Sequence, residues 1–167
     1  MPEFEHIRHR PPTELERERE LVLACPAMRS QVNLARIVRM AGCCGVRRIL
    51  SAGKVKLDPK ISRGAEDHLD LKFVRTLLPA LRKLRDEESR PLIGLEQTTD
   101  SQDIHQFEFP KRCVLVIGHE RDGIPPEILE ELDVSVEIPV WGLPYSYNAA
   151  TATAMALYEY CRQHPKG

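Results

Sequence analysis

Long apolar runs are the first feature that this sequence of 167 residues lacks. No hydrophobic stretch approaches the roughly 20 residues that a membrane-spanning helix needs. Residues 1–20 are highly charged and have no apolar core, so they do not resemble a secretory signal peptide. We therefore expect no membrane association. The composition, with 42% hydrophobic and 29% charged residues, is ordinary for a water-soluble protein.

An even set of cysteines and the usual spacings of metal ligands are also missing. The five cysteines are odd in number, the adjacent Cys43 and Cys44 lack zinc-ligand spacing, and the six histidines are scattered. We expect free and mostly buried thiols in a reducing compartment. The sequence therefore predicts a cytoplasmic protein that binds no metal.

Glycine is absent at the position where a dinucleotide-binding fold needs it. Residues 24–30, between the first predicted strand and the first predicted helix, are ACPAMRS. The glycine-rich fingerprint for a pyrophosphate belongs at this junction, so NAD and FAD are disfavoured. A P-loop is disfavoured for the same reason, and no Ser-His-Asp signature stands out.

Short apolar runs alternate with stretches of helical spacing, which is the pattern of an α/β domain on a mostly parallel sheet. The runs predict six strands, at residues 21–24, 46–51, 71–74, 91–95, 113–117 and 134–138. Helices are expected at residues 31–44, 61–69 (with Ser62 as its cap), 77–85, 127–132 and after Asn148. We expect one domain at residues 21–167, preceded by a charged arm at residues 1–20 with at most one helical turn.

The net charge of −1 does not by itself indicate a nucleic-acid-binding protein, but the charges are unevenly distributed. Residues 36–63 hold eight basic side chains against Asp58 alone, whereas residues 121–137 hold six acidic side chains against Arg121 alone. A basic stripe is what a phosphate-contacting face requires. A solvated helix face followed by a lysine-rich loop explains the same pattern equally well.

Three motifs follow one another along the chain. They are Asn33 with Arg39 six residues later, the turn Gly118-His119-Glu120 after a buried strand, and the series Ile138-Pro139, Gly142, Ser146 and Asn148. In this order they resemble the signature of the SpoU/TrmH branch of the SPOUT RNA 2′-O-ribose methyltransferases, across roughly residues 21–163. The resemblance implies a C-terminal trefoil knot, S-adenosyl-L-methionine as cofactor, an RNA substrate and a homodimer built on the first and last helices.

The resemblance also implies a role for individual residues. The catalytic set is Arg39, Asn33, Glu120, Ser146 and Asn148, and the contacts to the cofactor, mostly through backbone groups, map to Leu95, Gly118, Ile138 and Tyr147. Arg39 would act at the ribose hydroxyl. A guanidinium is effectively never neutral, so orienting the target phosphate and stabilising the developing alkoxide suit Arg39 better than a role as general base. Position alone would make it an ordinary surface arginine.

Two residues depart from the usual pattern of this branch, which has asparagine and leucine where this chain has His119 and Tyr147. The implied activity is S-adenosylmethionine-dependent RNA 2′-O-ribose methylation, with tRNA favoured over rRNA because the domain is nearly minimal. A non-catalytic RNA-binding or scaffolding module of the same fold is the alternative. His119, the near-neutral charge and the missing RNA-binding domain motivate it, and an excised domain of a larger protein also stays open.

Overall fold

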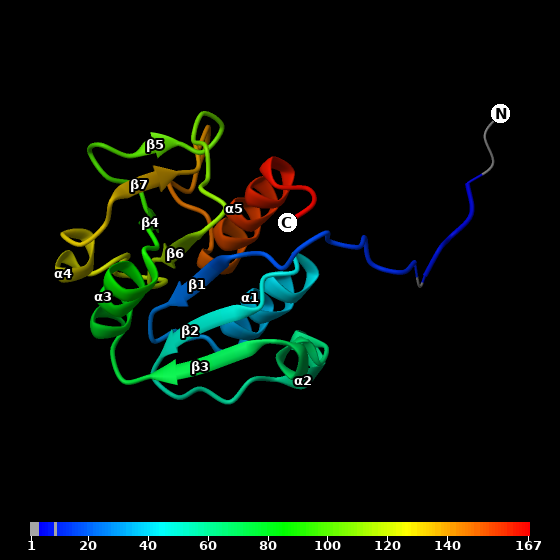
Figure 1. Ribbon diagram of the computed structural model, residues 1–167. Helices are drawn as coiled ribbons and strands as arrows, with labels where there is room; N and C mark the ends of the chain where they lie inside the picture. The colour runs from blue at the N-terminus through cyan, green and yellow to red at the C-terminus, as the bar shows by residue number, and fades with distance from the viewer. Residues whose placement is uncertain (1–3, 9) are drawn as a thin grey trace.

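In the computed structural model, which describes residues 4–8 and 10–167, seven parallel strands form a central sheet that helices cover on both faces (Figure 1). The strands are β1 (Leu21–Cys25), β2 (Arg48–Ala52), β3 (Asp70–Val74), β4 (Leu92–Leu95), β5 (Gln102–Asp103), β6 (Cys113–Ile117) and β7 (Val134–Glu137). The helices are α1 (Gln31–Cys43), α2 (Pro59–Ser62), the 3₁₀ helix η1 (Ala65–His68), α3 (Leu77–Glu88), α4 (Pro126–Leu129) and α5 (Ala149–Gln163).

The α/β class and the parallel sheet are confirmed, but the expected number of six strands is wrong. The additional strand among the described residues is β5, which lies in the polar segment after β4. It is only two residues long and pairs with β7 at the edge of the sheet, Gln102 opposite Val136 and Asp103 opposite Glu137. Backbone pairing alone makes this strand, and it has no apolar pattern from which it could be predicted.

The order of the strands is β3-β2-β1-β6-β4-β7-β5. The sheet therefore grows in one direction from β1 to β3, and the later strands lie on the other side of β1. Because every pairing is parallel, the carboxyl ends of the neighbours β6, β4 and β7 lie at the same edge. Ligands of open α/β sheets bind outside this edge, where the strand order reverses.

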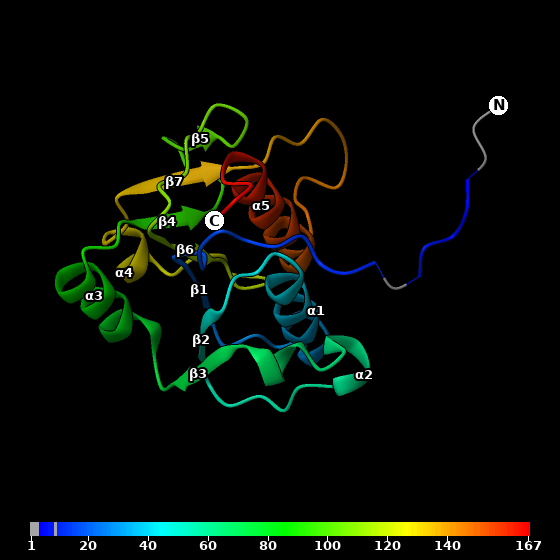
Figure 2. The same cartoon turned by 45° about the vertical axis from the view of Figure 1, so that its right-hand side comes forward.

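The core has two halves, one on each face of the sheet. Side chains of a strand alternate between the faces, and β1 contributes to both halves. Leu21, Leu23 and Cys25 pack with α1 and α5, whereas Val22 and Ala24 pack with α3. Figure 2 shows α1 and α5 on one side of the sheet and α3 and α4 on the other. Burial on both faces explains why the central strands are almost wholly apolar.

The predicted helix at residues 61–69 is two short helices, and Ser62 does not cap either of them. Asp58 caps α2, because its carboxylate accepts a hydrogen bond of 2.9 Å from the backbone N–H of Lys60. The hydroxyl of Ser62 instead donates a hydrogen bond to the backbone carbonyl of Asp58. Arg63 and Gly64 then adopt left-handed backbone angles, φ 59° and 75°, which interrupt the helix.

The end of the N-terminal segment packs against the domain through Arg19, which is buried. Its guanidinium donates hydrogen bonds to the carbonyls of Cys44, at 2.7 Å, and His164, at 2.6 Å. The guanidinium carbon also lies 5.6 Å from the centre of the Tyr160 ring. The described residues before β1 contain no helix.

The cysteines are free, as expected, with Cys25, Cys44 and Cys113 buried but Cys43 exposed. No helix in residues 4–8 and 10–167 combines the length and apolarity needed to cross a bilayer. Within the same ranges, no group of three or more His, Cys, Asp or Glu side chains is arranged as metal ligands.

Candidate functional site

A cavity of about 300 Å³ lies at the carboxyl ends of β4, β6 and β7. Its walls include six of the nine residues that the motifs predict for the site, namely Leu95, Gly118, Glu120, Ile138, Ser146 and Tyr147. The volume is at the lower end of the range for small-molecule sites. The polar turns that follow three separate strands are thus assembled into one concave site.

The turn after β6 needs glycine at both of its ends. Two backbone hydrogen bonds close the turn, from the N–H of His119 to the carbonyl of Gly123 (2.9 Å) and from the N–H of Gly123 to the carbonyl of His119 (3.2 Å). A Cβ atom on Gly118 would lie 3.1 Å from the Cα of Gly123. Gly123 itself has a φ of +67°, which side chains disfavour. The turn can therefore fold tightly against the cavity.

Glu120 connects this turn to the start of α1. Its Oε1 accepts hydrogen bonds from Asn33 Nδ2 and from the backbone N–H of Ser30, both at 3.1 Å. Its Oε2 accepts from the backbone N–H of Arg29 at 3.2 Å. Asn148 Nδ2 in turn donates to Asn33 Oδ1 at 3.4 Å. Asn33 and Asn148 are thereby joined to a residue of the cavity wall.

The environment of Glu120 favours its ionised form. Burial acts to raise the pKa of this carboxyl group, but the hydrogen bonds from Asn33, Ser30 and Arg29 together outweigh burial and hold the pKa below its ordinary value. Glu120 is therefore a carboxylate at neutral pH. It lies at the amino end of α1, where the exposed N–H groups of a helix favour a negative charge.

Arg39 is the one predicted site residue that lies apart from the other eight. It is exposed on α1 and does not line the cavity. Six residues of helix separate it from Asn33, which is about 9 Å along the helix axis. In the described ranges, no side chain pairs with its guanidinium in a hydrogen bond or salt bridge. Arg36, one turn earlier, is exposed as well.

His119 lies in the cavity wall with both of its ring nitrogens near polar groups. Nδ1 accepts from the backbone N–H groups of Arg121 and Asp122, at 3.3 and 3.4 Å. Nε2 lies 3.5 Å from Glu120 Oε2. Nδ1 also lies 3.0 Å from Asp122 Oδ2, so the ring stands between the carboxylates of Glu120 and Asp122.

Sequence reasoning missed several residues of the site. Glu96 and Gln97 line the cavity directly after β4, and the backbone N–H groups of Arg29 and Ser30 hold Glu120. Glu96 could have been found, because it is the first polar residue after a buried strand, as His119 is after β6. The two N–H groups carry no signal in the sequence, since any residue except proline would supply them.

An apolar surface adjoins the cavity, along α5 and the loop that precedes it. Trp141, Tyr145 and Tyr158 are 81%, 80% and 68% exposed. A second hollow of about 510 Å³ lies here and is mostly apolar; Trp141, Met155 and Tyr158 are among its lining residues. Large exposed apolar patches mark surfaces that another molecule covers.

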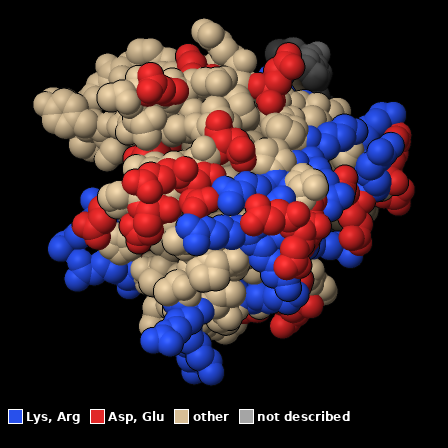
Figure 3. Space-filling view, turned by 60° about the vertical axis from the view of Figure 1, so that its left-hand side comes forward, with Lys and Arg blue, Asp and Glu red and all other residues tan. Residues whose placement is uncertain are grey.

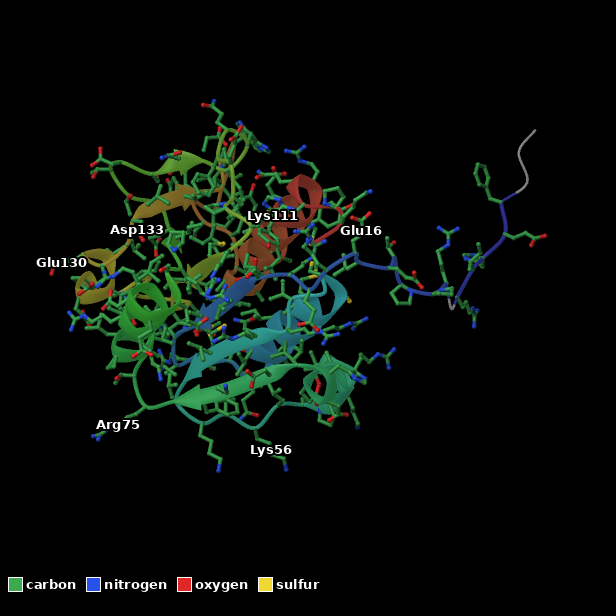
Figure 4. All side chains as sticks on the ribbon, in the orientation of Figure 1. Glu16, Lys56, Arg75, Lys111, Glu130 and Asp133 are labelled. Atoms are coloured by element: carbon green, nitrogen blue, oxygen red, sulfur yellow. The ribbon has the colours of Figure 1, made fainter. Side chains whose placement is uncertain are left out.

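Acidic and basic side chains are mixed on the face that α3 and α4 form (Figure 3). Figure 3 brings the side of α3 and α4 forward and shows acidic side chains gathered among basic ones, below an upper area with little charge. Figure 4 labels Glu130 and Asp133 beside α4, while Lys56 and Arg75 point outward from the side of β2 and β3. Lys56, from the predicted basic stripe, thus lies apart from Glu130 and Asp133, from the predicted acidic segment (Figure 4).

Comparison with known proteins extends the motif argument to the whole domain. The profile of the SpoU rRNA Methylase family matches residues 20–158. The chain belongs to the SpoU methylase family. Over 108 residues it is 39% identical to a mouse protein, "tRNA (guanosine(18)-2′-O)-methyltransferase TARBP1", a match that covers 64% of this chain. The same match covers only 7% of the mouse protein.

Solved structures of SpoU relatives have the same fold. The TrmH/SpoU tRNA modifying enzyme of Aquifex aeolicus superimposes with a TM-score of 0.84 at 25% identity, covering 90% of this chain and 78% of that one. The SpoU methyltransferase AviRb of Streptomyces viridochromogenes, solved in complex with the cofactor AdoMet, gives a TM-score of 0.79 at 28% identity. That superposition covers 90% of this chain and 63% of AviRb.

Proposed function

We propose that this SpoU-family chain transfers a methyl group from S-adenosyl-L-methionine to the 2′-hydroxyl of a ribose in RNA, with tRNA favoured over rRNA. The observation that carries the proposal is the cavity at the carboxyl ends of β4, β6 and β7, with the Glu120–Asn33–Asn148 network at its wall. The relatives from mouse and Aquifex aeolicus, both described as tRNA enzymes, support the choice of tRNA.

The residues of the cavity fit the cofactor. The absence of a side chain on Gly118 lets a ligand approach the backbone closely. Leu95, Ile138 and Tyr147 provide apolar surface and backbone groups on the other walls. These four residues would hold S-adenosyl-L-methionine, and AviRb, of the same family, is solved with AdoMet. When bound, the cofactor supplies an activated methyl group on a sulfonium.

The network around Glu120 would hold the polar wall of the site in one arrangement. The carboxylate binds the amide nitrogen of Asn33, and Asn148 binds the amide oxygen of the same side chain. The amide of Asn33 is therefore fixed at both ends, and it would support the wall from which Ser146 orients the ribose. Pre-organised polar groups of this kind lower the barrier, because they need no rearrangement during the reaction.

Arg39 completes the proposed catalytic set from outside the cavity of its own chain. Its role is to bind the phosphate next to the target ribose and to stabilise the alkoxide that forms as the hydroxyl loses its proton. The guanidinium would act when RNA is bound between α1 and the cavity, or when a second copy of the chain approaches. This requirement connects the role of Arg39 to the homodimer.

The homodimer is part of the same proposal. The exposed side chains of Trp141, Tyr145 and Tyr158 support it, because a second copy would remove this apolar surface from water. Light scattering coupled to gel filtration measures the mass directly. A monomer at micromolar concentration would contradict the dimer.

The remaining proposals follow from the resemblance to SpoU enzymes. Residues 21–167 would form the methyltransferase domain with a C-terminal trefoil knot. Residues 1–20, of which 1–3 and 9 lie outside the described residues, would form an arm. The position of β6 between β1 and β4 supports a threaded C-terminal half. The free cysteines support a cytoplasmic location. An experimental structure tests the knot, and microscopy of the tagged full-length protein tests the compartment.

Methyl transfer can be measured directly with radiolabelled S-adenosyl-L-methionine and total tRNA or rRNA. We expect label in tRNA, recovered after digestion as a 2′-O-methylated nucleoside. Label in a base, or no label in any RNA when the protein binds the cofactor, would contradict the proposed reaction. An Asn33→Ala variant serves as the negative control, since it removes the amide at the centre of the network.

A non-catalytic RNA-binding or scaffolding module is the second candidate. The position of Arg39 outside the cavity favours it, since this residue is then only one of several exposed basic side chains on and after α1. Cofactor binding without methyl transfer, even with a partner protein present, would support the module against the enzyme.

A further inference from the structure

Glu96 places a carboxylate in the wall of the cavity that none of the three motifs includes. It is the first residue after β4, at the carboxyl end of a strand in the middle of the sheet. The cavity contains two further carboxylates, those of Glu120 and Glu137. The hydrogen bonds of these three side chains decide which of them can still bind a ligand.

The position of Glu96 is fixed by its backbone and by its side chain. Its N–H donates to the carbonyl of Val136 and its carbonyl accepts from Ser135 Oγ, both at 3.0 Å, so β7 holds the residue in place. Oε1 accepts from the N–H of Gln97 at 3.1 Å, and Oε2 accepts from the N–H of Ile124 at 3.0 Å. The carboxylate is therefore pre-organised.

The two glycines of the turn after β6 leave the space that this carboxylate occupies. A Cβ atom on Gly118 would lie 2.8 Å from Glu96 Oε2, and one on Gly123 would lie 2.4 Å from the same atom. Real Cβ atoms do not approach so closely. The tight turn and the carboxylate are therefore packed against one another, and the carboxylate would have to move if either glycine carried a side chain.

Glu96 keeps capacity for further hydrogen bonds. A carboxylate has about four lone-pair sites, and the described residues supply only two donors to Glu96. Glu120 accepts three N–H groups and has His119 Nε2 at 3.5 Å, so it is nearly saturated. Glu137 is held on one side only, where Oε2 accepts from Ser101 Oγ at 2.8 Å. Glu96 is thus the one that is both rigidly held and open to a ligand.

We propose that Glu96 accepts hydrogen bonds from the 2′ and 3′ hydroxyls of the cofactor ribose and so anchors the adenosyl group in the cavity. The inference rests on the proposed methyltransferase function. Two neighbouring hydroxyls match the two oxygens of a carboxylate, and an acidic residue binds the ribose in this way in other open α/β sheets. The sulfonium has no N–H or O–H group, so it cannot donate a hydrogen bond to Glu96.

A thermodynamic cycle that changes the protein and the ligand together tests this contact. Calorimetry would measure the binding of S-adenosylhomocysteine and of its 2′-deoxy and 3′-deoxy ribose analogues to the wild type and to Glu96→Gln. In the wild type, we expect removal of either hydroxyl to weaken binding about tenfold, because hydrogen bonds to charged groups are strong. In Glu96→Gln, we expect roughly tenfold weaker binding of the parent ligand and a further loss of less than about threefold for either analogue.

Glu137→Gln is the matched control, since it removes the same charge from the same cavity. It should keep the full loss of affinity for the deoxyribose analogues. Glu96→Asp is the second variant of Glu96, for the case in which the glutamine variant does not fold. It keeps the charge but withdraws the carboxylate by one methylene, and it should show the same reduced discrimination. A thermal melt of each variant establishes that it is folded.

Three results would overturn the assignment. One is full discrimination against the deoxyribose analogues in a folded Glu96 variant. Another is lost discrimination in Glu137→Gln in place of Glu96→Gln. The third is a Glu96→Gln variant that loses affinity for S-adenosylmethionine but not for S-adenosylhomocysteine. That result would mean that the carboxylate of Glu96 attracts the sulfonium charge. A wild type that binds neither S-adenosylmethionine nor S-adenosylhomocysteine would reject the proposed function as well. A wild type that binds them, with the same discrimination against the deoxyribose analogues in Glu96→Gln, would reject only the role of Glu96.

Discussion

At the amino ends of α1 and α5, the carboxylate of Glu120 is hydrogen-bonded to α1 directly and is connected to α5 through Asn33 and Asn148. At their carboxyl ends, both helices meet around the guanidinium of Arg19. Glu120 accepts the backbone N–H groups of Arg29 and Ser30 at the start of α1. Arg19 donates to the carbonyls of Cys44 and His164, which cap the ends of α1 and α5. Each charge complements the helix dipole at its own end.

The two ends differ in what surrounds the charge. Glu120 lies in the wall of a cavity, and hydrogen bonds connect it through Asn33 to Asn148. Arg19 lines neither described cavity and lies against the ring of Tyr160. The same electrostatic principle therefore contributes to a candidate ligand site at one end and to a closed structural joint at the other. Substitutions at the amino end should therefore affect activity as well as stability, whereas those at the carboxyl end should affect stability and leave cofactor binding nearly unchanged.

The largest effect is expected for Arg39→Ala, on the same helix as the amino-end network. Turnover should fall by a factor of about 100 or more if Arg39 has the proposed role of stabilising the developing alkoxide. Cofactor affinity should stay nearly unchanged, because Arg39 does not line the cavity. Radiolabelled methyl transfer and calorimetry measure the two quantities.

Arg36→Ala is the control for Arg39, being equally exposed and three residues away on α1. It should weaken RNA binding modestly and reduce the salt dependence by about one unit of slope. Arg39→Lys sharpens the test, because it keeps the charge without the planar fork. Near-normal turnover in Arg39→Lys would mean that charge alone suffices, and near-normal turnover in Arg39→Ala would remove Arg39 from the site.

At the opposite end, Arg19→Ala should lower the free energy of unfolding by about 2–4 kcal/mol, because two carbonyl groups lose their donors. The affinity of the folded variant for S-adenosylhomocysteine should remain within about twofold of the wild type, since independent distant sites do not couple. Urea denaturation and calorimetry test both statements. Arg17→Ala, two residues earlier and exposed, is the control and should leave stability nearly unchanged. Unaltered stability of Arg19→Ala would contradict the structural role.

Glu120→Gln tests the amino end through its pH dependence. The folded pKa of Glu120 lies below its unfolded value, so its stabilising effect is complete above the unfolded pKa of about 4.3. It is lost as the pH falls through the folded pKa. We expect Glu120→Gln to cost about 1–2 kcal/mol at pH 7, and to reduce the acid sensitivity of the protein. A wild type and variant that lose stability in parallel between pH 5 and pH 3 would argue against the ionised network.

The smallest effect concerns the thiols at the carboxyl end. A hydrogen bond with Cys44 and the nearby charge of Arg19 hold the pKa of Cys161 below its ordinary value, against the effect of burial. In Cys44→Ala the pH midpoint for alkylation of Cys161 should therefore rise, with stability changed by less than about 1 kcal/mol. Mass spectrometry of iodoacetamide-treated protein measures labelling at each cysteine, with exposed Cys43 as the internal reference. An unchanged midpoint would mean that Cys44 does not set the reactivity of Cys161.

Much of the fold could be predicted from local patterns. Residues 113–117 are the strand β6 that their apolar run indicates, because a strand covered on both faces excludes polar side chains. The order of the motifs placed the site after the later strands, and eight of the nine predicted residues are assembled there. These features depend on side-chain chemistry that can be read in a linear sequence.

The tertiary structure decided the features that depend on the backbone or on distant partners. The edge strand β5 is made by backbone pairing with β7 alone. Arg19 looked like one more solvated charge in a run of charges, and only the meeting of two helix ends, 25 and 145 residues away in sequence, explains its burial. Glu96 acquired its position from a turn 28 residues later. Hydrogen bonds to backbone groups do not depend on which residue supplies them, so they leave no pattern in the sequence.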